Sequence, residues 1–240
     1  MVPTPSYMDD IAILVVGKEL DTNCEVLQRI ARKLIQWGQG NRVEFDQAKT
    51  ELIHFYKDRI VDTSISTSVQ ISDTITIEPK EEVRWLGIWF NRKLSFKTHV
   101  EKALAKANRV FYSISRLANC SRGLSFQAMR QLYLACITSI ADYGVPIWWK
   151  GQQHYLEKFQ KLQNNMLRKA LGAFRTSPIA AMEIEAAILP VRIRFDKICK
   201  NYAFRAIQLD QEHPIKKRMP DSFPFSIGED IEIDWEKFLD

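Results

Sequence analysis

The stretch of sequence that decides the fold is residues 6–17, SYMDDIAILVVG. Asp9 and Asp10 come directly before an aliphatic run, residues 11–16, which Gly17 ends. An unbroken aliphatic run of this length is typical of a buried strand, so we expect a β-hairpin with the two aspartates at its turn. Two carboxylates held on a rigid turn offer hard oxygen ligands for Mg²⁺. The alternative is that both aspartates are ordinary turn residues.

The residues up to about 92 predict a helix packed on an antiparallel sheet. Asp21 or Thr22 can cap a helix that reaches Trp37, with Gly38 and Gly40 as its stop. The strand candidates lie on both sides of a loop at residues 46–50. They are residues 43–45, 52–56, 68–71, 74–77 and 84–90.

After Asn91 the pattern becomes helical. Apolar residues recur at spacings of three and four in residues 97–117, 125–140, 153–171 and 193–209, and Pro178 and Pro190 bracket a shorter helix. The predicted class is therefore α+β. We expect an incomplete sheet-and-helix domain at residues 1–92, an all-helical region at 93–210 and an acidic tail or linker at 211–240.

The net charge of +5 is unevenly distributed along the chain. The balance is −4 for residues 1–90, +15 for residues 91–220 and −6 for residues 221–240. At 100° per residue, one face of the helix at residues 97–117 gathers four cations, Lys102, Lys106, Arg109 and Arg116. A polyanion such as nucleic acid is the expected partner, and a merely solvated basic surface is the alternative.

Composition excludes several other classes. The early aliphatic run is too short to span a bilayer, and it follows two aspartates rather than a basic segment, so we expect no signal peptide and an intracellular location, nuclear or cytoplasmic. The four cysteines are scattered without a Cys-x-x-Cys pair, which argues against a disulfide framework and a zinc site. For Trp148 and Trp149, core packing is expected over base stacking. For His54 and His99, a structural role is expected over metal ligation.

Several segments, in order, resemble one polymerase family. Residues 7–10, YMDD, resemble the Y-x-D-D box of reverse transcriptases. Residues 44–55, EFDQAKTELIHF, and 83–100, VRWLGIWFNRKLSFKTHV, resemble later blocks of non-LTR (LINE-type) retrotransposon polymerases. Residues 141–149, ADYGVPIWW, are similar to the thumb and connecting helices of these elements. The resemblance implies a partial polymerase palm followed by a helical thumb and connection.

The resemblance also implies roles for individual residues. Asp9 and Asp10 would be ligands of Mg²⁺ or Mn²⁺ in two-metal nucleotidyl transfer, and Lys49 would be the general acid to pyrophosphate. The primer grip would comprise Trp85, Leu86, Gly87 and Ile88. The cationic face, with Lys102, Lys106, Arg109 and Arg116, would hold the duplex of RNA template and DNA primer, and a dNTP would be the substrate.

The sequence departs from the family in three places. The family has a third metal-binding aspartate and a fingers region upstream of its Y-x-D-D box, and only eight residues precede Asp9, so we expect a truncated chain that does not polymerise on its own. Asn91 stands where many relatives have an acidic residue, and no cluster in residues 200–240 resembles a ribonuclease H site. The alternatives are a non-catalytic nucleic-acid-binding remnant and an unstable, decayed product.

Overall fold

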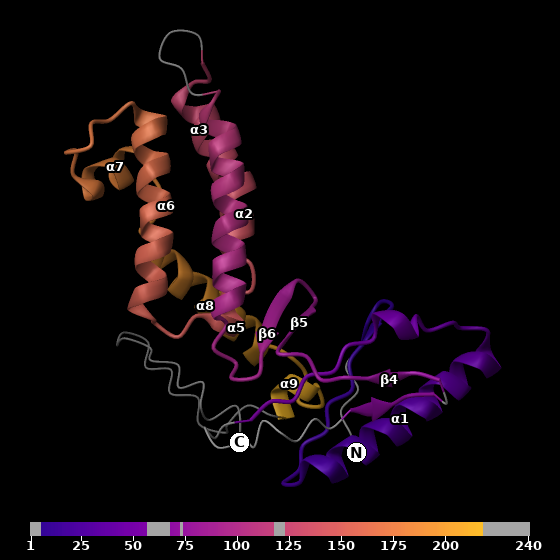
Figure 1. The fold of residues 1–240 in the computed structure, drawn as a ribbon. Coiled ribbons are helices and arrows are strands. Elements are labelled where there is room, and N and C mark those ends of the chain that lie inside the picture. The colour runs from indigo at the N-terminus through magenta and orange to yellow at the C-terminus, as the bar shows by residue number, and fades with distance from the viewer. Residues whose placement is uncertain (1–5, 57–67, 73, 118–122, 218–240) are drawn as a thin grey trace. The chain divides into compact units, whose positions relative to one another are not determined.

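The structure is a computed structural model that describes residues 6–56, 68–72, 74–117 and 123–217 (Figure 1). The chain divides into two compact units, Met1–His99 and Val100–Asp240. Each unit has its own hydrophobic core, so each is described by itself.

In the first unit, helix α1 (Leu20–Asn41) packs against a small hairpin. The hairpin consists of β3 (Val69–Gln70) and β4 (Thr76–Ile77), which pair antiparallel. Three buried residues form the centre of this contact, Cys24, Val69 and Ile71. The apolar stripe of α1 therefore covers one face of the hairpin, as the spacing of its apolar residues predicts.

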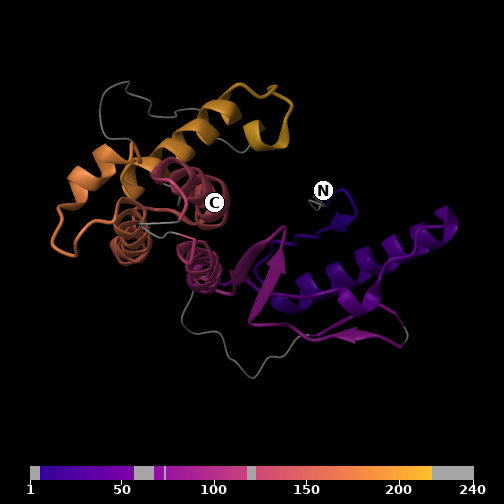
Figure 2. The same ribbon diagram turned by 90° about the horizontal axis from the view of Figure 1, so that it is seen from above.

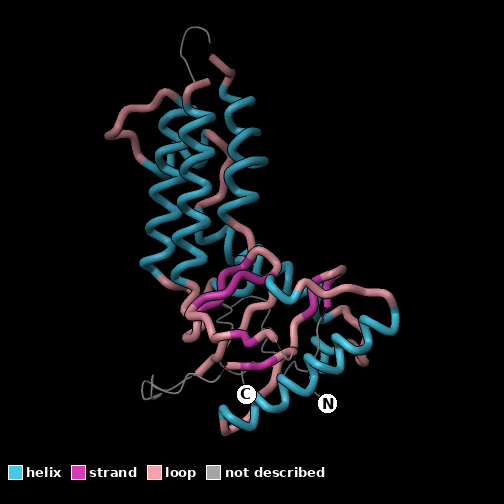
Figure 3. Tube along the Cα trace, turned by 45° about the vertical axis from the view of Figure 1, so that its right-hand side comes forward, coloured by secondary structure: helices cyan, strands magenta, loops and turns pink. Residues whose placement is uncertain are grey.

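The strands of the described residues pair only with their neighbours along the chain. Strand β1 (Ser6–Tyr7) pairs with β2 (Asp10–Ile11), and β5 (Glu82–Trp85) pairs with β6 (Ile88–Asn91), both antiparallel. With β3–β4 these make three separate two-stranded sheets, drawn magenta in Figure 3. The α+β class and the antiparallel pairing are confirmed, whereas the expected single sheet is absent from the described part of the chain.

Three strand predictions are wrong. Pairing of the aliphatic run ends at Ile11, and Leu14 and Val16 remain exposed rather than buried. Residues 43–45 form no strand, and residues 52–56 contribute one isolated bridge, from Leu52 to Pro79. Residues 52–56 make separate backbone hydrogen bonds, from Lys80 N to Leu52 O at 2.8 Å and from Tyr56 N to Arg92 O at 3.4 Å, and these do not form a continuous ladder.

Helix α1 continues through both glycines that were expected to end it. Gly38 is buried, and its neighbours Val43 and Phe45 approach so closely that a Cβ atom would not fit. The helix ends where Arg42 adopts the left-handed conformation (φ 59°) and the Val43 N–H donates to Gly38 O at 2.8 Å. A glycine inside a helix costs only about 1 kcal/mol, which this packing can offset.

The second unit is helical, and α2 (Lys97–Ser115) begins at the end of the first unit. The elements that follow are α3 (Phe126–Leu132), a π-helical turn η2 (Tyr133–Ile137), α4 (Thr138–Ala141), α5 (Val145–Trp148), α6 (Gln153–Leu171), α7 (Ile179–Glu185), α8 (Val191–Ile207) and α9 (Pro214–Lys217). Figure 2 looks down the long helix α6, which packs against α3, α7 and α8.

Local signals explain where these helices begin and end. Ser125 Oγ accepts a hydrogen bond from Ala128 N at 3.3 Å and so caps α3, as predicted. Gly172 ends α6 in the left-handed conformation, φ 63°. Within the described residues no helix is long and apolar enough to cross a membrane. Most of the expected acidic tail, residues 218–240, lies outside the described residues.

Aromatic rings form the core of the second unit. Trp148 is fully buried, stacks on Phe159 with ring centroids 5.5 Å apart, and meets Phe195 edge to face at 5.4 Å. Trp149 is also buried and donates from Nε1 to Asp196 Oδ1 at 2.9 Å. The prediction that both tryptophans pack in the core is confirmed.

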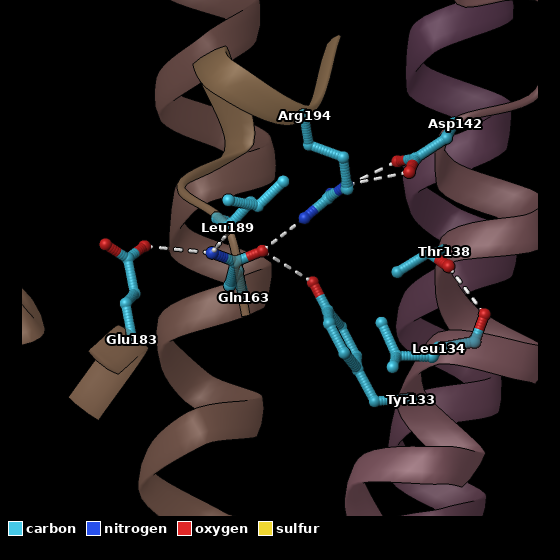
Figure 4. Close-up of polar contacts among 8 residues, drawn as sticks. All are labelled: Tyr133, Leu134, Thr138, Asp142, Gln163, Glu183, Leu189 and Arg194. Carbon is cyan, nitrogen blue, oxygen red and sulfur yellow. Dashed lines mark hydrogen bonds and ion pairs between the residues drawn. The ribbon is translucent and has the colours of Figure 1, made fainter. Parts of the chain in front are cut away.

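A buried polar network lies beside this core (Figure 4). Gln163, on α6, accepts hydrogen bonds from Tyr133 Oη at 2.8 Å and from Arg194, and donates to Glu183 Oε1 at 2.9 Å. Arg194 also forms a two-pronged ion pair with Asp142. Because each polar group here has a partner, the network fixes η2, α6, α7 and α8 in one arrangement.

Candidate functional site

The Y-x-D-D segment folds as a tight hairpin. Tyr7 pairs with Asp10 across a two-residue turn formed by Met8 and Asp9, and Met8 has a positive φ of 54°. Such turns suit the twist of a two-stranded ribbon. The predicted turn is confirmed, and both carboxylates are exposed on it. The buried strand that was expected to hold the turn rigidly is missing.

Asp9 and Asp10 match Mg²⁺ in the kind of ligand they offer. Carboxylate oxygens are the ligands that this ion prefers. Within the described residues, however, no group of three or more His, Cys, Asp or Glu side chains gathers anywhere. Among the described residues, the hairpin therefore offers two carboxylate ligands.

Lys49 lies in a short 3₁₀ turn, η1 (Gln47–Lys49), and is paired locally. Its Nζ lies 2.8 Å from Asp46 Oδ2, and Asp46 Oδ1 accepts a hydrogen bond from Ala48 N at 3.2 Å. The hydrogen bond and charge of Asp46 raise the pKa of Lys49, and Lys49 in turn lowers the pKa of Asp46. A general acid works best when its pKa lies near the working pH, which for a lysine requires a lowered pKa. The ion pair with Asp46 raises the pKa of Lys49 instead.

The segment expected to be a primer grip forms the turn between β5 and β6. Trp85 pairs with Ile88, and the two residues between them, Leu86 and Gly87, have φ values of 47° and 80°. Positive φ at both central positions is the geometry of a two-residue hairpin turn, and Gly87 adopts it without steric cost. Ile88 is buried, so one side of this turn is anchored in the unit.

Asn91 has a local structural role. Its Nδ2 donates to Ser95 Oγ at 2.7 Å, and its Oδ1 accepts from Ser95 N at 2.8 Å. This pair of hydrogen bonds closes the turn between β6 and α2. An asparagine supplies both a donor and an acceptor here, which a carboxylate would not do.

Helix α2 separates its apolar and cationic residues as predicted. The buried face comprises Val100, Leu104, Ala107, Phe111 and Ile114. Lys102, Lys106 and Arg109 are exposed. Arg116 is also exposed but lies in the turn after the last helical residue, Ser115, so its expected place on the helix is wrong by one residue.

The predicted site residues form separate groups. In the described part of the first unit, no hydrogen bond or ion pair joins Asp9 or Asp10 to Lys49. The group that the structure does bring together is the cationic face of α2. Sequence reasoning missed a second cationic group, formed by Lys161, Arg168 and Arg175 around a pocket beside α6. Its signal in the sequence was a repeated spacing of seven residues.

Comparison with known proteins gives distant relatives of one kind. The chain is 21% identical over 213 residues to the retrovirus-related Pol polyprotein from the type-1 retrotransposable element R1 4 of Nasonia vitripennis, a match covering 83% of this chain and 54% of that protein. It is 23% identical over 163 residues to the probable RNA-directed DNA polymerase from transposon BS of Drosophila melanogaster, covering 68% of this chain and 18% of that protein.

A third relative is the RNA-directed DNA polymerase from the mobile element jockey of Drosophila melanogaster, 23% identical over 168 residues, with 70% of this chain and 18% of that protein covered. The chain thus spans about half of the first relative and about a fifth of the others. No family model and no solved structure matches it. These matches show distant homology to non-LTR retrotransposon polymerases over most of the chain.

Proposed function

We propose that this chain is the palm-hairpin, thumb and connection portion of an RNA-directed DNA polymerase of the non-LTR type, and that it binds the duplex of RNA template and DNA primer. The observation that carries the proposal is the hairpin at residues 6–11, which presents Asp9 and Asp10 on a tight, exposed turn. The distant homology of most of the chain to polymerases of mobile elements supports the same conclusion.

In this proposal Asp9 and Asp10 hold the metal through their carboxylate oxygens. A bound Mg²⁺ would favour loss of the proton from the attacking hydroxyl and stabilise the leaving oxygen. The turn at Trp85–Ile88 would position the primer end, and Lys49, released from Asp46, would donate a proton to pyrophosphate. These roles come from the family resemblance. They are compatible with the structure because Asp9, Asp10 and Lys49 are exposed and residues 85–88 form a turn.

The exposed face of α2 would bind the duplex by its phosphates. Lys102, Lys106 and Arg109 lie on one side of a helix whose other side is buried, so their positive charges face outward together. Contacts with phosphate do not depend on base sequence and weaken steeply with salt. A chain with this surface could bind the duplex without catalysing DNA synthesis. Non-catalytic nucleic-acid binding is therefore the second candidate function.

Primer extension separates the two candidates. The full chain is incubated with an RNA template, a DNA primer, dNTPs and Mg²⁺ or Mn²⁺, beside Asp9→Asn and Asp10→Asn. Because the described residues bring only two carboxylates to the metal site, we expect tight hybrid binding with extension at background in all three proteins. Extension that both variants abolish would establish catalysis by this chain. Extension above background that is equal in wild type and Asp9→Asn would refute the metal assignment, and absence of hybrid binding by the wild-type chain would refute the proposed function.

A further inference from the structure

A pocket with a cationic wall lies on α6, separate from the proposed duplex surface of α2. It has a volume of about 530 Å³ and is lined by residues of α6 and by Arg175, in the loop that joins α6 to α7. Lys161 and Arg168 come from α6, two turns apart on the same side, and Arg175 comes from the loop. None of the sequence-based predictions assigns a role to these residues.

Within the described part of the chain, the three cations have no carboxylate partner. Of the ion pairs in the described residues, none includes Lys161, Arg168 or Arg175. One carboxylate, Glu157, also lines the pocket, and its Oε1 accepts from Gln153 Nε2 at 3.2 Å. The lining is therefore positive overall, which favours an anionic ligand.

The guanidinium of Arg168 is partly buried in the wall of the pocket. Its Nε is buried and has no hydrogen-bond partner among the described residues. A buried donor without an acceptor is costly, and most such groups in folded proteins are satisfied. Because this Nε lies beneath the surface, a phosphate would bind the guanidinium through its terminal Nη nitrogens, in charge-assisted hydrogen bonds. Asn164 and Asn165 add side-chain amides that can donate to the same anion.

The buried network keeps the wall of the pocket in place. Gln160 lines the pocket, and its Nε2 donates to Asn164 Oδ1 at 3.0 Å and to Glu183 Oε1 at 2.9 Å. Glu183 receives a second amide donor from Gln163. Glu183 thus receives hydrogen bonds from two amides, and in the described residues it forms no ion pair with Arg168 or Lys161.

An exposed aromatic ring stands next to these cations. Phe174 directly precedes Arg175 and is 81% exposed at the start of a turn closed by Ser177 N donating to Phe174 O at 3.1 Å. A large apolar ring gains little from contact with water. Cations that follow a phosphate backbone, combined with an aromatic ring for a base, are the usual means of binding a single strand.

We propose that Lys161, Arg168, Arg175 and Phe174 form a binding site for a single-stranded polynucleotide, distinct from the duplex surface on α2. Phosphates of the strand lie against the three cations, and one base stacks on Phe174. The inference rests on the proposed function, because it identifies the partner as template outside the duplex. A duplex cannot use Phe174 in this way, since its bases are already stacked and paired.

Fluorescence anisotropy with the full chain tests this site. The probes are a labelled 20-nucleotide single-stranded RNA and a blunt 20-base-pair RNA–DNA hybrid, each titrated over a range of salt concentrations. The variants are Lys161→Ala/Arg175→Ala, and Phe174→Ala beside Phe174→Tyr. The control is Arg29→Ala/Lys33→Ala, which removes two exposed cations from α1. Thermal unfolding verifies that each variant is folded.

We expect Lys161→Ala/Arg175→Ala to weaken single-strand binding at least about tenfold and to reduce its salt slope by about 1.4. Phe174→Ala should weaken it at least about fivefold and Phe174→Tyr should restore it, because stacking on an aromatic ring contributes this much per base. The affinity of these variants for the hybrid should change less than about twofold. The single-strand affinity of the Arg29→Ala/Lys33→Ala control should also change less than about twofold.

Single-strand affinity unchanged in both the Lys161→Ala/Arg175→Ala and Phe174→Ala proteins would overturn the site, while retained hybrid binding would leave the proposed function standing. Equal weakening of both probes would also overturn it, because the cations would then be a second duplex surface. A wild-type chain that binds neither probe would refute the proposed function and this inference together.

Discussion

Arg194 and Asp142 form a two-pronged ion pair between α8 and the turn that follows α4. Arg194 Nε lies 2.7 Å from Asp142 Oδ2, Nη2 lies 3.1 Å from Oδ1, and each side chain is 13% exposed. The residues are 52 positions apart in the sequence. Burial raises the pKa of Asp142 and the charge of Arg194 opposes that rise, so the pair holds an ionised carboxylate in a place where it would otherwise be costly.

The first prediction concerns this pair. Arg194→Met should lower the free energy of unfolding by about 3–5 kcal/mol, because Asp142 would remain buried without its partner. The matched control is Arg192→Met, two residues earlier on α8. The side chain of Arg192 is 70% exposed, and its Nε lies 4.0 Å from Asp196 Oδ2. Its loss should cost less than about 1 kcal/mol. Urea unfolding of both variants checks the difference, and similar midpoints would contradict it.

The second prediction concerns Tyr133. Burial raises the pKa of its hydroxyl from the usual 10.0 to about 12. Its contribution to stability is fully present below pH 10 and is lost as the pH rises toward 12, because the unfolded chain ionises first. The loss amounts to about 2–3 kcal/mol over this window.

Unfolding measured from pH 8 to 12 checks this prediction. Tyr133→Phe should remove that part of the pH dependence, whereas Tyr202→Phe, at an exposed position, should keep it. Cys199, whose pKa burial also raises to about 12, contributes equally to all three chains and cancels in the comparison. Parallel curves for wild type and Tyr133→Phe would contradict the assignment.

Local patterns could be predicted from the sequence, and long-range partners could not. The faces of α2 followed from helical spacing, and the turn at Met8–Asp9 followed from a short motif. Residues 84–90, expected as one strand segment, instead contain the turn at Leu86–Gly87. The exposure of the aliphatic run after Asp10 could not be predicted, because burial of a strand depends on neighbouring strands that its own sequence does not reveal.

The pocket on α6 and the buried network were missed for a related reason. Glutamine is a residue type that usually lies at the surface. Gln163 is nevertheless fully buried, because Tyr133, Glu183 and Arg194 satisfy its amide. These partners come from different helices, 20 to 31 positions away. Spacing along one helix indicates which side of it is polar, but not which other helices meet it.

The third prediction uses the two glycines of α1. Gly38→Ala should destabilise the chain by about 1–3 kcal/mol, because the new Cβ would lie 2.6 Å from Val43 O and 2.8 Å from the Phe45 ring. Gly40→Ala has nothing within 4 Å and should stabilise the chain by about 0.5–1 kcal/mol through helix propensity. Opposite shifts of the thermal midpoint are expected. A stabilising Gly38→Ala would contradict the close packing at Gly38, and a destabilising Gly40→Ala would contradict the helical conformation at Gly40.

The fourth prediction is that the cationic face of α2 determines the salt dependence of hybrid binding. Replacing Lys102, Lys106 and Arg109 together by alanine removes three exposed cations without touching the buried face. Because each phosphate contact contributes about 0.9 to the slope of log affinity against log salt, the slope should fall by about 2 to 3. Binding at low salt should weaken for hybrids of any sequence alike.

Anisotropy titrations of the 20-base-pair hybrid at several salt concentrations measure this slope. Alanine in place of Arg29 and Lys33, exposed cations of α1, is the charge-loss control and should shift the slope by less than about 0.5. Adding Arg116→Ala to the triple variant asks whether the turn after α2 extends the surface: a further fall of about 0.9 means that it does. If the triple variant keeps the wild-type slope, α2 does not contact the duplex, and its cationic face is an ordinary solvated surface.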